Sequence, residues 1–553
     1  MSRLGLGLLT AVVFVGGPAQ PEPEVMTSRQ LRTAMDRFAP VELRMDLTRL
    51  PETERAALGK LVEACRVMDA LYLRQEWGGN GAVLQRLLAE PSSTLKADRL
   101  EWFRWNKGPW SVNDGAAPFV EGVAAKPQAG TFYPPDATKA EVMTWLETLR
   151  GDERKAAESS YTVIRRKPDG RLSAVPYSVE YQPELARAAA LLRDAAKATA
   201  QPTLRSLLEK RAQAFLSNAY TESDAALVLL DSSIDVAVGP YEPDEDGWLG
   251  AKTAFECLLA LRDDESTKQV ATLAAQLPIL HQRLPVAPAL RGPAPAQLGP
   301  ILVLDLLYAT GEADQARAPG GYGLPNDPEA TRAGTRTAVY RNVLGASFPA
   351  TEQIALRTLE PKRARLTLED VVLDVAMVRM MDGMGPRMLS DGSRSVTTAM
   401  QELAARAAQL RSMLMELWAV GDLVERGIFS QEKGSALYST FLVLTLGRAE
   451  ARNFNATSTA ASVLILTRLL KDGAIWISSE GRLDFGSERI AVSVRKQLAE
   501  LLNAQVSGNV ASVRSMFSEL STIDKDLERI LRRLKGLPPP RRPIYVTAEK
   551  LTP

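Results

Sequence analysis

The sequence predicts a mainly helical α+β protein, in which a mixed α/β region precedes a helical one. Strand-like runs, rich in Val, Ile, Leu and Tyr and bounded by Gly, Pro or Asp, recur as far as about residue 344. From Pro361 to Leu537 the apolar residues have helical spacing, with one interruption at Ala474–Phe485 that is typical of a small hairpin. The 553 residues are enough for two or more domains. We therefore place the boundary between the two regions near residue 366.

The mixed region contains both helices and strands. One hairpin is marked by its turn, because Pro168-Asp169-Gly170 separates two β-rich runs within Tyr161–Ser178. A short buried strand is expected to lead into the acidic loop of Ile234–Gly250, and helix is expected at Ala251–Leu261 and again up to Leu280. The other expected elements are helices over 51–88, 139–149, 183–199 and 202–217, a Pro/Ala-rich connector over 285–300, strands over 301–311 and 338–344, and a loop over 321–328.

A long buried helix is predicted within Leu366–Leu389, in the middle of the chain. Gly383, Gly385 and Pro386 would end it. In many metallopeptidases such a helix carries His-Glu-x-x-His, which supplies two zinc ligands and a general base. This helix carries none of those residues. Its apolar residues at helical spacing are Val371, Val372, Val375, Met377, Val378 and Met381.

Composition excludes several classes of function. The net charge is +1 and no basic run occurs, so no nucleic-acid partner is predicted. The one histidine, His281, cannot make a two-histidine zinc site, and we expect it to be a surface or capping residue. Cys65 and Cys257 are far apart in sequence, and we expect two buried free thiols. No nucleophile elbow or phosphate-binding loop occurs.

The N-terminal residues predict export. Met1–Ala19 has one basic residue, Arg3, followed by an apolar run, which is typical of a secretory signal peptide. Residues 20–25 are a Pro/Glu-rich linker. The apolar run is short for a bilayer span, and no later stretch predicts a membrane span in the mature chain. We expect a periplasmic or secreted protein.

Several phrases in the chain occur in a recognisable order: GPW, FYP, YTVIRR, DVAVGPYE, LPND and GMGP. Together they resemble the exported bacterial branch of the dipeptidyl peptidase III family, from about Val41 to Leu551. The resemblance implies a zinc exopeptidase of two lobes around a wide cleft that binds peptide as an extended strand. The mixed lobe, with a small β-barrel-like core, would cover 26–365, and its residues 250–300 are expected to pack partly with the other lobe. The helical lobe would cover 366–537, with the zinc-site helix at 366–385, and 538–553 would be an extended tail.

The same resemblance places the family's zinc site on this chain. GMGP puts Asp382 at the second zinc histidine, and the first histidine and the general-base glutamate at Val378 and Arg379. In the family's longer motif these two fall at Met377 and Val378, which restores neither residue. Ala408 stands at the glutamate ligand and Ser458 at a downstream histidine. The family's zinc is therefore predicted to be lost, with no catalytic and no metal-ligating residue left, and an Arg379–Asp382 helix ion pair is expected in its place.

More of the residues that the resemblance assigns to peptide binding are present in this sequence than of those it assigns to the zinc site. Glu242 matches the glutamate that holds the peptide amino terminus, whereas Asp244 replaces a tyrosine that assists the transition state. Asn326 is kept in LPND, with Gly323 in place of a second asparagine, and Asn455 is kept near Ser458. Turn chemistry alone would also account for such residues.

We therefore expect an inactive homologue of a zinc peptidase that retains binding of peptides or of a protein partner. Two alternatives remain open at this point. One is an active hydrolase with a non-standard site, built on the acidic residues Asp244, Glu245 and Asp246. The other is a structural or interaction module whose cleft is unused.

Overall fold

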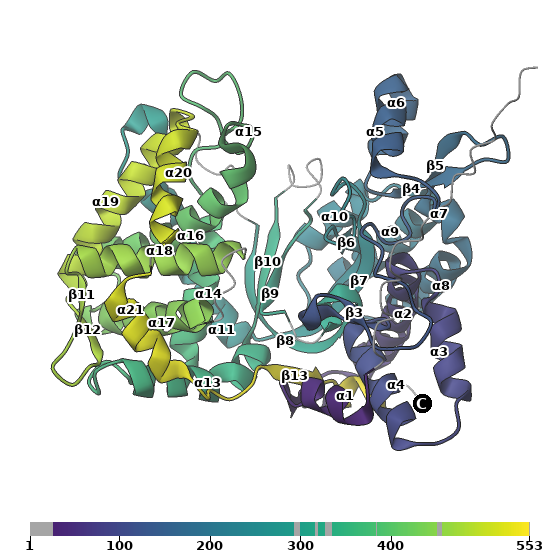
Figure 1. Cartoon of the computed structure of the whole chain (residues 1–553), viewed down its shortest axis with the longest axis horizontal. Coiled ribbons are helices and arrows are strands. Elements are labelled where there is room, and N and C mark those ends of the chain that lie inside the picture. The colour runs from purple at the N-terminus through teal and green to yellow at the C-terminus, as the bar shows by residue number, and fades with distance from the viewer. Residues whose placement is uncertain are drawn as a thin grey trace, which may run out of the picture.

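The computed structural model describes residues 26–291, 299–315, 319–326, 334–382, 384–450, 456–521 and 523–551. The predicted signal peptide and linker, 1–25, lie outside these residues. The protein has two lobes, and strands β8, β9 and β10 lie between them (Figure 1). Most of the ordered structure is helical, which confirms the predicted α+β class. None of the described helices is long and apolar enough to cross a membrane.

The first lobe is built on three long helices, α2, α8 and α9, which pack side by side. Helix α2 also lies against strand β7. The predicted hairpin is confirmed as β4 (Thr162–Arg166) and β5 (Leu172–Pro176). The helices of this lobe are α1 (Ser28–Met35), α2 (Glu52–Glu76), α3 (Asn80–Ala89), α4 (Thr94–Asn106), α5 (Lys139–Thr148), α6 (Gly151–Glu158), α7 (Tyr177–Glu180), α8 (Gln182–Ala198), α9 (Pro202–Ser217) and α10 (Thr221–Val228). A short pair, β2 (Trp110–Ser111) and β3 (Ala117–Pro118), follows α4.

A five-stranded sheet connects the lobes in the order β6-β7-β8-β10-β9. Its strands are β6 (Ile234–Glu242), β7 (Ala254–Arg262), β8 (Ile301–Thr310), β9 (Gly321–Leu324) and β10 (Arg336–Tyr340). Only the β8–β10 pair is parallel. The helix expected at Ala251–Leu261 is wrong, because this segment forms β7. The strand is buried along Ala254–Ala260, and a strand covered on both faces has an unbroken apolar run that resembles a buried helix.

The two edge strands of this sheet are connected by side chains. From β9, the Tyr322 hydroxyl donates to Asp235 Oδ1 on β6 over 2.6 Å. Arg336 on β10 donates to the same carboxylate over 2.8 Å. Asn326 Nδ2, just after β9, donates to the carbonyl of Tyr241 over 2.6 Å. The sheet is therefore curled like a barrel, but within the described residues no backbone pairing closes it.

Alternate residues of the sheet face different cores. Ile301 and Val303 of β8 and Val339 of β10 belong to the core of the helical lobe. Leu302 and Leu304, their neighbours on β8, belong to the core of the first lobe. Successive side chains of a strand point to opposite faces. The middle of the sheet is thus a wall that both lobes share.

The helical lobe contains α14 at its centre, packed against α16 and α17. Helix α14 spans Leu368–Asp382, so the predicted central helix is confirmed. The strand-like run expected over 338–344 is strand only to Tyr340, after which α13 begins. The helices are α13 (Arg341–Thr358), α15 (Val396–Met400), α16 (Ala404–Glu425), α17 (Gln431–Glu450), α18 (Thr457–Lys471), α19 (Ser487–Val506), α20 (Val510–Ser518) and α21 (Lys525–Leu531). The predicted hairpin is β11 (Ile475–Ile477) with β12 (Leu483–Phe485).

Two helices from the middle of the chain also pack into this lobe. They are α11 (Asp264–Ala274) and α12 (Leu277–Arg283), which connect β7 to β8. Their residues Val270, Leu273 and Leu280 lie in the helical-lobe core. The chain therefore enters the helical lobe, returns through β8, and enters it again after β10.

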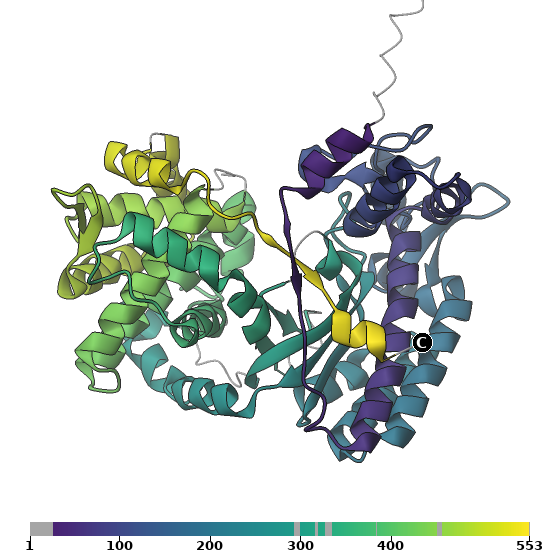
Figure 2. The same ribbon diagram turned by 90° about the horizontal axis from the view of Figure 1, so that it is seen from below.

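The C-terminal residues return to the first lobe (Figure 2). Strand β13 (Arg541–Ile544) pairs in parallel with β1 (Ala39–Glu42). The expected extended tail ends in a short helix, α22 (Val546–Lys550), whose Ala548 is buried in the first-lobe core with Tyr545.

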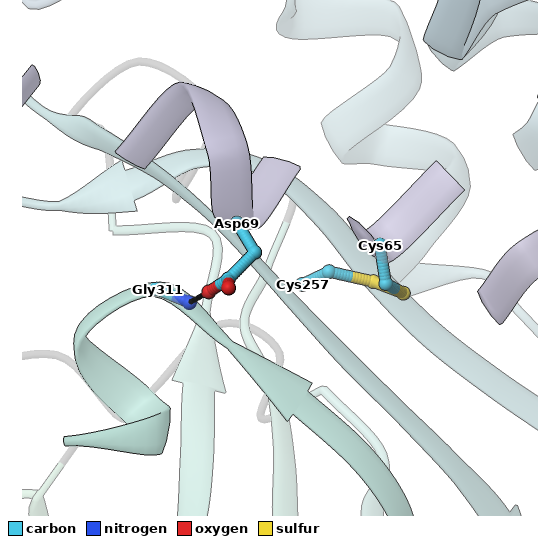
Figure 3. The surroundings of a disulfide bond; sticks show 4 residues. All are labelled: Cys65, Asp69, Cys257 and Gly311. Atoms are coloured by element: carbon cyan, nitrogen blue, oxygen red, sulfur yellow. Dashed lines mark hydrogen bonds between the residues drawn. A yellow bond between two sulfur atoms is a disulfide. The ribbon is translucent and has the colours of Figure 1, made fainter. Parts of the chain in front are cut away.

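A disulfide joins the first lobe's longest helix to its sheet (Figure 3). Cys65 on α2 and Cys257 on β7 are bonded, with their Cα atoms 5.2 Å apart. One turn further along α2, Asp69 accepts the N–H of Gly311 at the end of β8 over 3.1 Å. The expectation of two free thiols is wrong. That expectation rested on the distance between the two cysteines in sequence, which does not show that α2 packs against β7.

A pair of carboxyl groups lies in the helical-lobe core. Asp374 of α14 and Glu416 of α16 are each 1% exposed, and each affects the pKa of the other. Burial is the main cause that raises the pKa of both groups. The charge of Arg448 on α17 opposes this rise, whereas Asp370 adds to it at Asp374 and Asp382 adds to it at Glu416. Two buried carboxyl groups that interact titrate as a pair, and their burial favours a proton held between them.

Replacing both cysteines by alanine should destabilise the protein. The bond closes a loop with a sequence separation of 192 residues, and such cross-links typically contribute about 2–4 kcal/mol to the free energy of unfolding. Melting curves with and without reductant would measure it. Reductant should lower the melting temperature of the wild type and leave that of the double variant unchanged. Equal sensitivity of the two proteins would contradict the bond.

The carboxyl pair should make stability depend on pH. The folded-state pKa of the pair lies above the unfolded value of about 4. The pair therefore contributes fully to the free energy of unfolding below about pH 4, and this contribution is lost as the pH rises through the folded-state pKa. Glu416→Gln should flatten the pH dependence of the unfolding free energy between about pH 5 and 8, by up to about 1.4 kcal/mol per pH unit. The exposed Glu432→Gln is the control. Parallel curves for all three proteins would exclude a shared proton.

Candidate functional site

The C-terminal end of α14 holds the positions that the sequence resemblance predicts for a metal-binding helix. Val378 and Arg379 are half-buried there, and Met377, Met380 and Met381 are buried in the core. Asp382 is the last residue of the helix and is exposed. Gly383 lies outside the described residues. The sequence thus keeps the helix and fills its inner face with thioethers, which suit irregular core space.

Asp382 is held from the neighbouring helix. Its carboxylate is hydrogen-bonded to Ser412 of α16, and Arg379 and Arg411 act on it through their charges. Surrounding protein atoms raise the pKa of this carboxyl, and Ser412 and the two arginines lower it. The hydrogen-bond partner is therefore Ser412, not the Arg379 expected from sequence. The carbonyl of Ala408, one turn earlier and 3.1 Å away, is a second acceptor for the single O–H of Ser412.

The other two positions from this part of the family pattern provide no metal ligand. Ala408 has no donor atom on its side chain, and Ser458 lies half-buried in the first turn of α18. Asn455 lies outside the described residues. His281 is 4% exposed on α12, so its expected surface position is wrong.

The residues present do not fit a zinc ion. A catalytic zinc needs three N, O or S ligands and a base for its water. Val378 and Ala408 offer no such atoms, and Arg379 is a fixed cation that would repel the metal. No group of three or more His, Cys, Asp or Glu side chains in the described part of the chain could hold a metal ion.

A second group of site positions lies at the end of β6. Glu242 accepts the N–H of Asp244 over 2.6 Å. Burial, and then the charge of Glu312, raises the pKa of Glu242 to about 8. Glu256 on β7 is deeply buried, and burial with the charges of Glu242 and Glu312 raises its pKa well above the usual range. None of the groups that shift the pKa of Glu242 is a cation, so a cation placed beside this carboxyl would be favoured.

Asn326 is brought to this same place. Its bond to the carbonyl of Tyr241 holds Asn326 against the residue before Glu242. Gly323 lies three residues earlier, on β9, opposite Thr337 of β10. Glu242, Asp244 and Asn326 therefore form one group on the first lobe. Within the described residues, no hydrogen bond or ion pair connects it to the α14 positions.

The acidic loop after β6 has structural partners. Glu245 accepts from the Tyr72 hydroxyl over 2.6 Å, and Lys126 lies 3.5 Å away. Asp246 accepts from the Tyr133 hydroxyl and from the N–H groups of Ala251 and Lys252. These carboxylates are occupied in ordering the loop. The loop therefore gives no support to a hydrolase built on Asp244, Glu245 and Asp246.

Four side chains near these positions were not predicted from the sequence. They are Glu256, Glu312, Arg411 and Ser412. Glu256 was hidden by the helix assigned over β7, although an acid within an apolar run is a recognisable signal. Arg411 and Ser412 follow Ala408 by three and four residues, so helical spacing places all three on one face of α16.

Comparison with known proteins matches the whole architecture. A dipeptidyl-peptidase III from Corallococcus sp. strain EGB is 35% identical, with a TM-score of 0.83 over 96% of this chain and 99% of that one. The DPP III structure from Caldithrix abyssi is 28% identical, with a TM-score of 0.87 over 94% and 100%. A curated relative from Arabidopsis thaliana, named Nudix hydrolase 3, is 28% identical over 95% of this chain and 75% of its own. No family model matches the sequence. The two-lobed fold and the level of identity together show that this chain belongs to the dipeptidyl peptidase III family.

Proposed function

We propose that the protein is a catalytically inactive member of its family that binds peptides. The observation that carries this proposal is the set of side chains at the end of α14 and on α16, which packs against it. Val378, Arg379 and Ala408 stand where a metal and its base would need donors, and they supply hydrophobic contacts and a positive charge. Loss of one ligand would only weaken metal binding. The side chains present here provide neither metal ligands nor a general base.

Peptide binding is supported by the first-lobe group. Glu242 is a carboxylate in a buried, acidic surrounding, which favours a bound ammonium group such as a peptide amino terminus. Asn326 fixes the loop beside it. The edge strands β6 and β9 add backbone groups, which recognise an extended peptide without particular side chains.

Export is part of the proposal. A disulfide between α2 and β7 is stable in oxidising compartments and rare in the reducing cytosol. It agrees with the signal-peptide pattern of Met1–Ala19. We therefore propose a periplasmic or secreted location.

The purified protein should contain no stoichiometric zinc and should not hydrolyse a dipeptidyl arylamide, with or without added metal. Elemental analysis and a turnover assay measure the two properties. A gain-of-function variant provides the control: Val378→His, Arg379→Glu, Asp382→His and Ala408→Glu together restore three ligands and a base, and should bind zinc. Chelator-sensitive turnover by the wild type would overturn the proposal.

A peptide with a free amino terminus should raise the melting temperature of the wild type. Affinity should increase from about pH 6 to about pH 8, because the raised pKa of Glu242 means that a bound ammonium must displace a proton. Glu242→Gln should weaken binding by about 10- to 100-fold, the value of a charge-assisted hydrogen bond. The exposed Glu153→Gln serves as the control. Unchanged affinity in Glu242→Gln would show that the amine is held elsewhere.

A further inference from the structure

Positive side chains from three separate segments meet on the helical lobe. Arg357 lies in the last turn of α13, Arg482 directly precedes β12, and Arg529 lies in α21. Arg533 and Lys535 follow in and just after the 3₁₀ turn that continues α21. We call these five residues the basic cluster. The β11–β12 hairpin lies on the side of the helical lobe that faces away from the first lobe (Figure 1), and the cluster shares no residue with the candidate site.

Hydrogen bonds to backbone carbonyls hold the basic cluster together. Arg533 donates from Nε to the carbonyl of Arg357 over 2.7 Å and from Nη1 to that of Gly481 over 2.9 Å. Arg357 donates from Nη1 to the carbonyl of Lys535 over 2.9 Å. Arg482 donates to carbonyls at the C-terminal end of α13. These bonds fix the guanidinium groups in position but do not neutralise them, because a carbonyl oxygen carries only a partial charge.

Two of the guanidinium groups converge on one glycine. A Cβ atom at Gly481, whose φ is +72°, would lie 3.3 Å from Nη1 of Arg533 and 3.4 Å from Nη2 of Arg529. The two arginines are four residues apart, and like charges at this spacing in a helix repel each other. In the part of the chain that the structure describes, neither arginine is in an ion pair with a carboxylate. A bound anion would relieve this repulsion.

The carboxylates of the same segments are too few to neutralise the basic cluster. Glu360 is hydrogen-bonded to Ser478. Glu480 and Glu528 are the other two glutamates in these segments, against five positive side chains in the cluster. The side chain of Arg529 is exposed and makes no hydrogen bond to the described residues. All of its N–H groups are therefore open to a ligand from solvent.

We propose that the basic cluster binds a phosphate group between Arg529 and Arg533. A guanidinium presents parallel N–H donors that match phosphate oxygens, and a phosphate monoester has up to two negative charges and three acceptor oxygens. Two converging guanidinium groups suit such an anion better than a carboxylate, which has one charge. A soluble phosphate compound and the head group of an anionic phospholipid present the same chemistry. The proposal is independent of peptide binding by the protein.

The test uses both sources of phosphate on the whole protein at constant ionic strength. Inorganic phosphate is titrated and followed by its phosphorus NMR signal, and vesicles of phosphatidylglycerol are sedimented with the protein, with zwitterionic phosphatidylcholine as the control. Arg529→Gln should weaken binding about 10-fold, the effect of losing one charge-assisted hydrogen bond. It should keep the wild-type melting temperature, because its side chain has no hydrogen-bond partner. The exposed Arg394→Gln should leave binding unchanged.

The outcomes distinguish the two sources. Saturable binding of inorganic phosphate that Arg529→Gln weakens supports the site with a soluble ligand. Sedimentation with phosphatidylglycerol vesicles that the same variant weakens, without saturable binding of inorganic phosphate, supports the site with a lipid ligand. Absence of both, equal sedimentation with the two kinds of vesicle, or equal effects of Arg529→Gln and Arg394→Gln would overturn the proposal. If Arg529→Gln melts at a lower temperature, the exposed Lys535→Gln decides by the same criteria.

Discussion

The structure depends on the alternation of side chains in β8 and β10. Ile301, Val303 and Val339 complete the helical-lobe core, and Leu302, Leu304 and Ala338 complete the first-lobe core. A slip of one residue in either strand would exchange the two sets. Neither lobe can therefore keep its core if this register changes, and the sheet couples two cores that the sequence otherwise separates. The same sheet carries Glu242 at the end of β6 and Asn326 just after β9.

Much of this fold could be predicted, and the failures have a common cause. Helix α14, the hairpins at Thr162–Pro176 and Ile475–Phe485, and helices α8 and α9 all carry clear local signals, either helical spacing or a turn between β-rich runs. Strand β7 does not, since a strand buried on both faces has no alternation. The wrong prediction at β7 also concealed the buried Glu256, and sequence separation alone gave no sign that Cys65 and Cys257 are bonded. Errors of this kind arise from tertiary burial, which a single sequence does not display.

The sequence predicted which residues belong to the candidate site, but not which side chains would contact them. Sequence placed Val378, Arg379 and Asp382 on one helix end, where the structure has them. It could not show that Ser412 would interact with Asp382, or that the half-buried Arg411 would be close enough for their charges to interact. Those relations depend on how α14 and α16 pack, and the rotation of one helix against another is not encoded in local spacing.

The pairing of β13 with β1 has a consequence for the order in which the protein can be completed. Residues 39–42 emerge early in synthesis, and their strand partner, 541–544, is among the last segments made. Until then the first-lobe core also lacks Tyr545 and Ala548. A nascent chain therefore presents one unpaired strand edge for nearly the whole of translation, a state that invites association with other chains. Chaperone occupancy of that edge during synthesis would suit such an architecture.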